Sequence, residues 1–225
     1  MNTPLRRWRL TARVTLPLLV LTSIAVAPTL AQTSPDAPTI TFRKIFKSSF
    51  PEFVEIKVSQ TGAATYDIRQ LTDDPSPHNT ELAVPLAKKI FDLAGELHNF
   101  AGLDLEMHRR IANLGQKTFE YDRGSESHSV TFNYTVDPFA TQLLNIFEGL
   151  TRQESDLANL QRTMRYDRLG VNDVLLQIER DYNLKVFPQP DQLLPSLDQL
   201  AADNHFIDIA RERARTLAGR IRSGH

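Results

Sequence analysis

The chain has 225 residues, of which 41% are hydrophobic and 24% are charged, and its formal net charge is -1. These values are typical of globular proteins, so a wholly disordered chain is excluded, and a near-neutral chain is not an obvious nucleic-acid binder. The sequence contains no cysteine. Disulfides, cysteine-ligated zinc, iron–sulfur ligation and a thiol nucleophile are therefore excluded as well.

The first 31 residues have the pattern of a secretory signal peptide. Four arginines precede an apolar stretch at residues 16–27, no acidic residue occurs before Asp36, and the segment ends in the small residue Ala31. The apolar stretch is shorter than the ~20 residues that span a bilayer. We expect cleavage after Ala31 and export to the periplasm or the exterior of a bacterial cell, with an uncleaved anchor as the alternative. Removing the four arginines changes the net charge from -1 to -5.

Residues 32–39 are polar, contain two prolines and predict a flexible lead-in. Residues 40–46 are strand-like. Residues 53–58 and 64–68 alternate apolar and polar side chains on either side of the turn signal Thr61-Gly62. This pattern predicts a β-hairpin.

The next segments predict a helix and then a second hairpin. Residues 71–79 have the composition of a loop, and Thr80 is positioned to cap a helix that extends to Leu97. A second short helix is expected at 105–114, with Asp104 as its cap. Strands are expected at 118–121 and 128–134. Residues 40–136 therefore predict an antiparallel sheet built from two hairpin units with an intervening helix.

From Asp137 to the C-terminus the pattern is helical. Asp137-Pro138 is a helix start, and one apolar stripe extends from Phe139 to Met164, with a lapse at Gln153 and Glu154. Further helices are expected from Asn172 or Asp173, at 193–200 and at 207–221. The predicted fold is α+β, with residues 137–225 packing on the sheet region in one domain and no transmembrane helix in the mature chain.

One group of side chains has the composition of a metal site. Glu96, His98, Glu106 and His108 flank the glycines that separate the two expected short helices. If those helices fold back on each other, imidazole and carboxylate ligands converge, as transition metals require. The alternative is that the four are surface residues at helix ends. No cofactor is expected from the sequence.

Three further features are weighed against simpler explanations. Asp73-Asp74 is a calcium candidate but also a typical solvated turn. Ser48 and Ser49 are hydroxyl nucleophile candidates, with a turn role as the alternative. Five arginines between residues 211 and 222 suit an anionic surface or, more simply, a solvated helix face near a C-terminus.

A stretch at the start of the predicted sheet resembles a known kind of domain. Residues 42–66, with Ser48-Ser49, Pro51, Gly62 and Tyr66, are similar to the opening hairpin of uncharacterised domains in exported bacterial proteins. The resemblance implies export and a β-rich beginning, and it implies no activity.

These patterns favour a non-enzymatic binding or scaffolding protein of the cell envelope, with a possible protein partner, no nucleic acid and an oligomeric state that the sequence leaves open. The alternative is an extracytoplasmic, hydrolase-like enzyme whose site is assembled from distant residues. A histidine within ~3 Å of a carboxylate in a cleft is the arrangement that favours this alternative. A third hypothesis, an apolar ligand between sheet and helices, requires a pocket of ~300 Å³ or more.

Overall fold

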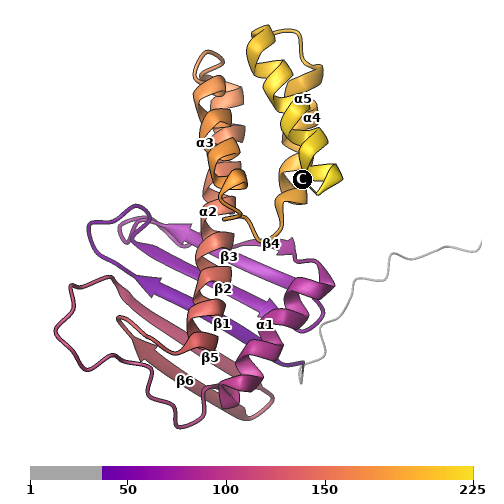
Figure 1. The fold of residues 1–225 in the computed structure, drawn as a ribbon. Helices are drawn as coiled ribbons and strands as arrows, with labels where there is room; N and C mark the ends of the chain where they lie inside the picture. Colours follow the sequence, from indigo (N-terminus) through magenta and orange to yellow (C-terminus); the bar gives the residue numbers. More distant parts are fainter. Residues whose placement is uncertain (1–36, 225) are drawn as a thin grey trace, which may run out of the picture. The chain divides into compact units, whose positions relative to one another are not determined.

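A computed structural model describes residues 37–224, in which an antiparallel sheet is followed by a mostly helical half (Figure 1). This arrangement confirms the predicted α+β fold. The predicted signal peptide, residues 1–31, and most of the predicted lead-in lie outside the described residues. Among residues 37–224, no helix combines the length and apolar character needed to cross a membrane.

The sheet has six strands in the order β4-β3-β2-β1-β5-β6, and neighbouring strands are antiparallel. Its strands are β1 (Thr39–Ile45), β2 (Phe53–Ser59), β3 (Ala63–Arg69), β4 (His78–Glu81), β5 (Gln116–Arg123) and β6 (Glu126–Phe132). The predicted hairpins are confirmed as β2–β3 and β5–β6. Strand β1 joins them into one sheet because it pairs with both β2 and β5.

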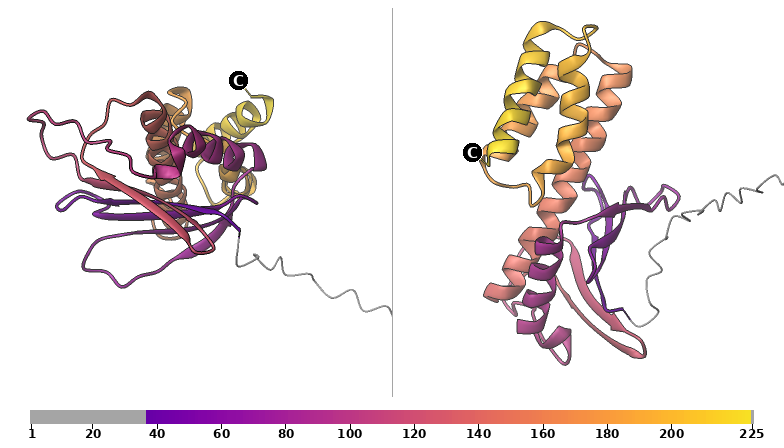
Figure 2. Two further views of the ribbon diagram at one scale, coloured as in Figure 1. Left: turned by 90° about the horizontal axis from the view of Figure 1, so that it is seen from below. Right: turned by 90° about the vertical axis from the view of Figure 1, so that its right-hand side faces the viewer.

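Alternation along the strands gives the sheet one apolar and one polar face. The apolar side chains face α1 (Val84–Glu96) and the first half of α2 (Pro138–Tyr166), which lie on the same side of the sheet (Figure 2). Phe42 of β1 stacks on Phe147 of α2 at 5.1 Å between ring centroids, and Phe119 packs against both rings. Burial of these aromatic rings fixes α2 on the sheet.

The turn between β2 and β3 depends on a glycine. Gly62 has a φ of 98°, which favours glycine. A Cβ at this position would lie 2.5 Å from the Leu82 carbonyl oxygen, too close for any side chain. The Leu82 amide donates to the Gly62 carbonyl at 2.8 Å. The turn therefore packs tightly against the chain that leads into α1.

Two local predictions are wrong. Residues 78–81 form strand β4, so Thr80 lies in a strand and α1 begins after Ala83 instead. Residues 105–114 form no helix, because their backbone is held by Asn133 and Tyr134, which follow β6. The amides of Met107 and Leu114 donate to the Tyr134 carbonyl and the Asn133 side chain, which leaves them unavailable for helical hydrogen bonds. The only short helical turn here is η1 (His98–Phe100).

Helix α2 contributes to two hydrophobic cores. Its first half packs under the sheet, and its second half packs with the remaining helices, α3 (Val171–Asn183), η2 (Pro190–Leu193), α4 (Leu194–Ala202) and α5 (Asp208–Ser223). Gly149 allows a close approach between α2 and the segment after α3, since a Cβ there would lie 2.5 Å from the Val186 carbonyl oxygen. The predicted start of α2 is confirmed, with Asp137 accepting hydrogen bonds from the amides of Phe139 and Ala140.

Candidate functional site

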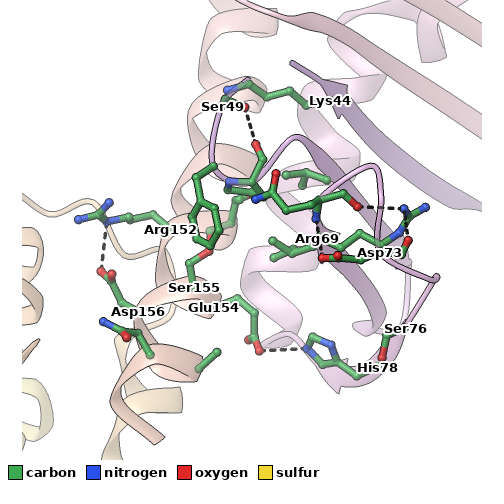
Figure 3. Close-up of a pocket in the computed structure, with 18 of the residues that line it drawn as sticks. Lys44, Ser49, Arg69, Asp73, Ser76, His78, Arg152, Glu154, Ser155 and Asp156 are labelled. Carbon is green, nitrogen blue, oxygen red and sulfur yellow. Dashed lines mark hydrogen bonds and ion pairs between the residues drawn. The ribbon is translucent and has the colours of Figure 1, made fainter. Parts of the chain in front are cut away.

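A groove of about 1190 Å³ lies between the exposed side of α2 and the loops that join β1 to β2 and β3 to β4 (Figure 3). Val54 and Ile68 supply apolar lining from the sheet, while Ser155 and Asn159 supply polar lining from α2. Small-molecule sites typically occupy ~300–1,000 Å³. The groove therefore has room for a ligand larger than a typical small molecule.

One carboxylate ties the two loops of the rim together. Glu52 accepts hydrogen bonds from the amides of Ser48, at 2.6 Å, and Leu71, at 3.2 Å. The Ser49 hydroxyl lies 2.6 Å from the carbonyl oxygens of both Phe46 and Pro51, so it bonds its own loop, as the turn interpretation expected. This ordered rim holds the ring of Phe50 in solvent, 92% exposed.

The loop after β3 is organised by Arg69. Its guanidinium donates to Asp67, at 3.0 Å, and to the carbonyl of Asp73, at 3.0 Å, and it lies 4.4 Å above the Phe53 ring. The Asp73 carboxylate accepts from the Gln70 amide at 3.2 Å. Asp73, half of the calcium candidate, therefore bonds its own turn.

A histidine–carboxylate pair joins the edge of the sheet to α2. His78 Nε2 of β4 lies 3.0 Å from Glu154 Oε1, and both residues line the groove. The His78 ring stacks on Tyr66 of β3 at 5.6 Å between centroids. Burial of Tyr66, and after it the charge of Glu154, raises the pKa of this phenol above its ordinary value. Tyr66 is therefore neutral at physiological pH.

A second polar cluster joins α2 to α3. Asp156 and Asp181 are 8% and 7% exposed, and Arg152 Nε lies 3.2 Å from Asp156 Oδ2 and 2.7 Å from Asp181 Oδ2. Burial raises the pKa of Asp156 to about 6, although Arg152 partly opposes the shift. Burial acts in the same direction on Asp181, but hydrogen bonds from Gln177 and Arg152 outweigh it and lower the pKa of Asp181. The proton of this pair therefore resides on Asp156 at mildly acidic pH.

Three glutamines connect the helical half to the edge of the sheet. Gln153, which is almost fully buried, donates to Gln192 at 2.7 Å and accepts from the Gln189 amide at 3.0 Å. Gln192 donates to the Glu81 carbonyl, and the Ala83 amide donates to Gln189. Gln153 and Glu154, which interrupt the apolar stripe of α2, therefore form this glutamine contact and the His78–Glu154 pair beside it.

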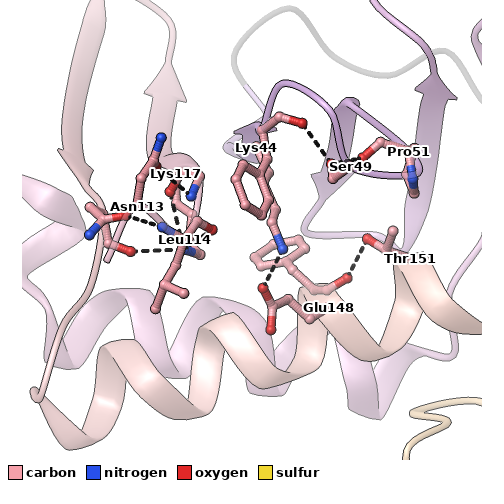
Figure 4. Close-up of polar contacts among 12 residues, drawn as sticks. Lys44, Ser49, Pro51, Asn113, Leu114, Lys117, Glu148 and Thr151 are labelled. Carbon is pink, nitrogen blue, oxygen red and sulfur yellow. Dashed lines mark hydrogen bonds and ion pairs between the residues drawn. The ribbon is translucent and has the colours of Figure 1, made fainter. Parts of the chain in front are cut away.

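Two lysines occupy the region where β1 and β5 meet α2 (Figure 4). Lys44, which lines the groove, pairs with Glu148 at 2.9 Å. Lys117 is buried and donates to the carbonyls of Leu114, Gly115 and Asn133. Burial, and after it the charge of Lys44, lowers the pKa of Lys117. Both amines are therefore held by groups of the protein itself.

The four residues predicted as a metal site are not brought together as a ligand set. Glu96 and His98 are exposed around the end of α1, Glu106 accepts from the Asn133 amide, and His108 Nε2 lies 2.9 Å from Asp104. Within residues 37–224, no three histidine, aspartate or glutamate side chains are placed to hold one metal ion.

The arginines of α5 are engaged in ion pairs with neighbouring carboxylates. Arg213 and Arg220 both pair with Glu179 of α3, and Arg222 pairs with Asp198 of α4. Arg211 and Arg215 pair within α5, with Asp208 and Glu212. Three of these arginines therefore connect α5 to α3 and α4, and the other two form ion pairs within α5.

Comparison of the chain with protein-family models found no match, and comparison with curated proteins also found none. The functional argument therefore rests on the geometry of the groove.

Proposed function

We propose that the chain is an exported bacterial protein of the cell envelope that binds an extended segment of a partner polypeptide in the groove beside α2. The signal-peptide pattern of residues 1–31 and the resemblance of residues 42–66 support the export part of the proposal. The binding part is supported by one observation above the others, the size of the groove together with its ordered rim.

The lining of the groove suits a polypeptide. Apolar side chains from the sheet lie beside hydroxyl and amide groups from α2, which is the combination that binds both side chains and backbone of a ligand. Phe50 adds an exposed aromatic ring at the rim, and aromatic residues are enriched among residues that dominate binding energy.

The charges of the groove favour an uncharged segment. Lys44 pairs with Glu148, and Arg152 pairs with Asp156, while the lining residues Arg162 and Asp74 have opposite charges. A charged ligand gains little from groups that are already paired. Shape and hydrogen bonding are therefore the expected basis of recognition.

Co-purification from the native envelope, with bound proteins identified by mass spectrometry, tests the proposal. Ala158→Trp places a large ring in the groove from an exposed position of α2, and Ala202→Trp makes the same change at an exposed position of α4 outside it. A partner that the wild type and Ala202→Trp retain and Ala158→Trp loses is the expected result. Equal recovery with both variants would contradict groove binding.

The hydrolase alternative is favoured by the His78–Glu154 pair. A carboxylate that orients an imidazole is part of a Ser-His-Asp/Glu triad, and a 3.0 Å contact in a groove is the arrangement that this alternative requires. Among the described residues, however, no serine or threonine hydroxyl is hydrogen-bonded to His78. Assay of ester and peptide hydrolysis by wild type and His78→Gln separates the two functions. Turnover that His78→Gln abolishes, with its fold intact, would assign catalysis to the groove.

A further inference from the structure

Exposed apolar and basic side chains gather where β5 begins and β6 ends. Four large apolar residues there are more than a third exposed, and Val136 is 65% exposed. Arg109 and Arg110 are exposed in the adjoining loop. We call this set the end patch, and its members are Arg109, Arg110, Leu114, Tyr134, Val136 and Phe139.

Hydrogen bonds place the two segments of the end patch side by side. The Met107 amide donates to the Tyr134 carbonyl at 2.9 Å. The Asn133 side chain accepts from the Leu114 amide at 2.7 Å and donates to the Ala112 carbonyl at 3.0 Å. The loop at 107–114 therefore lies along the linker between β6 and α2.

The end patch has unneutralised positive charge. Within residues 37–224, no carboxylate forms an ion pair with Arg109 or Arg110, in contrast to the arginines of α5. The acidic residues beside the end patch are engaged with their own neighbours. Asp104 pairs with His108, Glu106 accepts from the Asn133 amide, and Asp137 caps α2.

We propose that the end patch docks the protein on the surface of a bilayer that contains anionic lipids. Unpaired arginines are attracted to anionic headgroups, and neighbouring tyrosine, phenylalanine, leucine and valine side chains enter the interfacial region. None of the six residues lines the groove beside α2, so the end patch and the groove are different sets of residues. This inference is independent of the proposed ligand of the groove.

Vesicle co-sedimentation of the processed protein tests the proposal, with phosphatidylglycerol–phosphatidylethanolamine vesicles compared with phosphatidylcholine vesicles. The wild type is expected to bind the anionic vesicles more tightly, and added salt is expected to weaken binding. Arg109→Glu combined with Arg110→Glu, and separately Leu114→Ser combined with Val136→Ser, are each expected to weaken binding by about tenfold or more, because each pair removes one of the two attractions.

Matched controls come from the turn between α2 and α3, which also has exposed arginines and apolar side chains. Carboxylates offset its positive charge, because Asp167 lies between Arg165 and Arg168 in the sequence and the charge of Arg168 acts on Asp203. Arg165→Glu with Arg168→Glu, and Tyr166→Ser with Leu169→Ser, make the same kinds of change far from the end patch in the sequence. Both controls are expected to bind as the wild type does, and urea unfolding verifies that all variants are folded. Failure of the wild type to bind anionic vesicles would overturn the proposal, as would equal losses in the controls. Self-association without vesicle binding, abolished by Leu114→Ser with Val136→Ser, would instead assign the end patch to a second copy of the chain.

Discussion

Asp156 of α2 and Asp181 of α3 share a single cation, since the guanidinium of Arg152 contacts both carboxylates. Both aspartates are buried. Two buried carboxylates beside one guanidinium leave an excess negative charge, and it is relieved when one of them takes up a proton. The α2–α3 packing is therefore coupled to pH.

Stability is expected to decrease as pH rises through about 6. The pKa of Asp156 is raised from 3.8 to about 6 in the native state, so the native state holds this proton in a range where the unfolded state has released it. The stabilising effect of protonation is full below pH ~4 and is lost by pH ~7, with a total of about 3 kcal/mol. Asp181, whose pKa is lowered, has the opposite effect, but only as pH falls below its ordinary range. Urea unfolding between pH 4.5 and 7.5 measures the slope.

Asp156→Asn is expected to flatten this profile and to increase stability at pH 7.5 by about 1–2 kcal/mol, because the buried excess charge is gone. Asp181→Asn is the matched control, and it is expected to destabilise, because it removes the ionised partner closest to Arg152. A profile unchanged in Asp156→Asn would show that another group carries the pH dependence.

Gly62→Ala is expected to destabilise the protein by about 2 kcal/mol or more, because the turn requires a positive φ and a Cβ would collide with the Leu82 carbonyl. Gly219→Ala is the control. Gly219 lies within α5 with no atom within 4 Å of an added Cβ, so alanine is expected to stabilise by about 0.5–1 kcal/mol. In thermal unfolding, the Tm is expected to fall in Gly62→Ala and to rise in Gly219→Ala. A Tm that does not fall in Gly62→Ala would contradict the described geometry of the turn.

Asp137→Ala is expected to cost about 1 kcal/mol, since the carboxylate accepts from the amides of Phe139 and Ala140 at the start of α2. Asp137→Asn keeps an accepting oxygen and is expected to lose much less. Equilibrium unfolding in urea measures both. Equal losses in the two variants would argue that charge at the helix terminus matters more than the hydrogen bonds.

The sequence predicted those strands and helix ends whose structure follows from the residues of the segment itself. Val54, Ile56 and Val58 alternate with polar residues, and all three are buried in β2 as predicted. Asp137-Pro138 likewise marks the observed start of α2. In each case the backbone preference and the buried face agree.

The predictions failed where distant residues determine the structure. Strand β4, with the sequence His-Asn-Thr-Glu, has no apolar alternation and is a strand because it pairs with β3. Residues 105–114 contain enough apolar residues for a helix, but Asn133 and Tyr134 take their backbone hydrogen bonds. Tertiary contacts override weak local preference in both segments.

The candidate site was out of reach for the same reason. His78 and Glu154 come from β4 and α2, which are far apart in the sequence. The groove also depends on the β1–β2 and β3–β4 loops, which the hydrogen bonds of Glu52 connect. The available signal was the polar lapse at Gln153 and Glu154 in an otherwise apolar stripe. A polar interruption of a core-facing stripe indicates a buried polar joint, but its partners cannot be named until the fold is known.

Site-specific photo-crosslinking in intact cells tests the central claim, that the groove holds a segment of a partner protein. A photoreactive phenylalanine analogue at residue 158 faces the groove, and the same analogue at residue 202 lies outside it. A discrete crosslinked species of higher mass at position 158 and none at position 202 is the expected result. The same products from both positions, or none from position 158 with the protein present in the envelope, would contradict the claim.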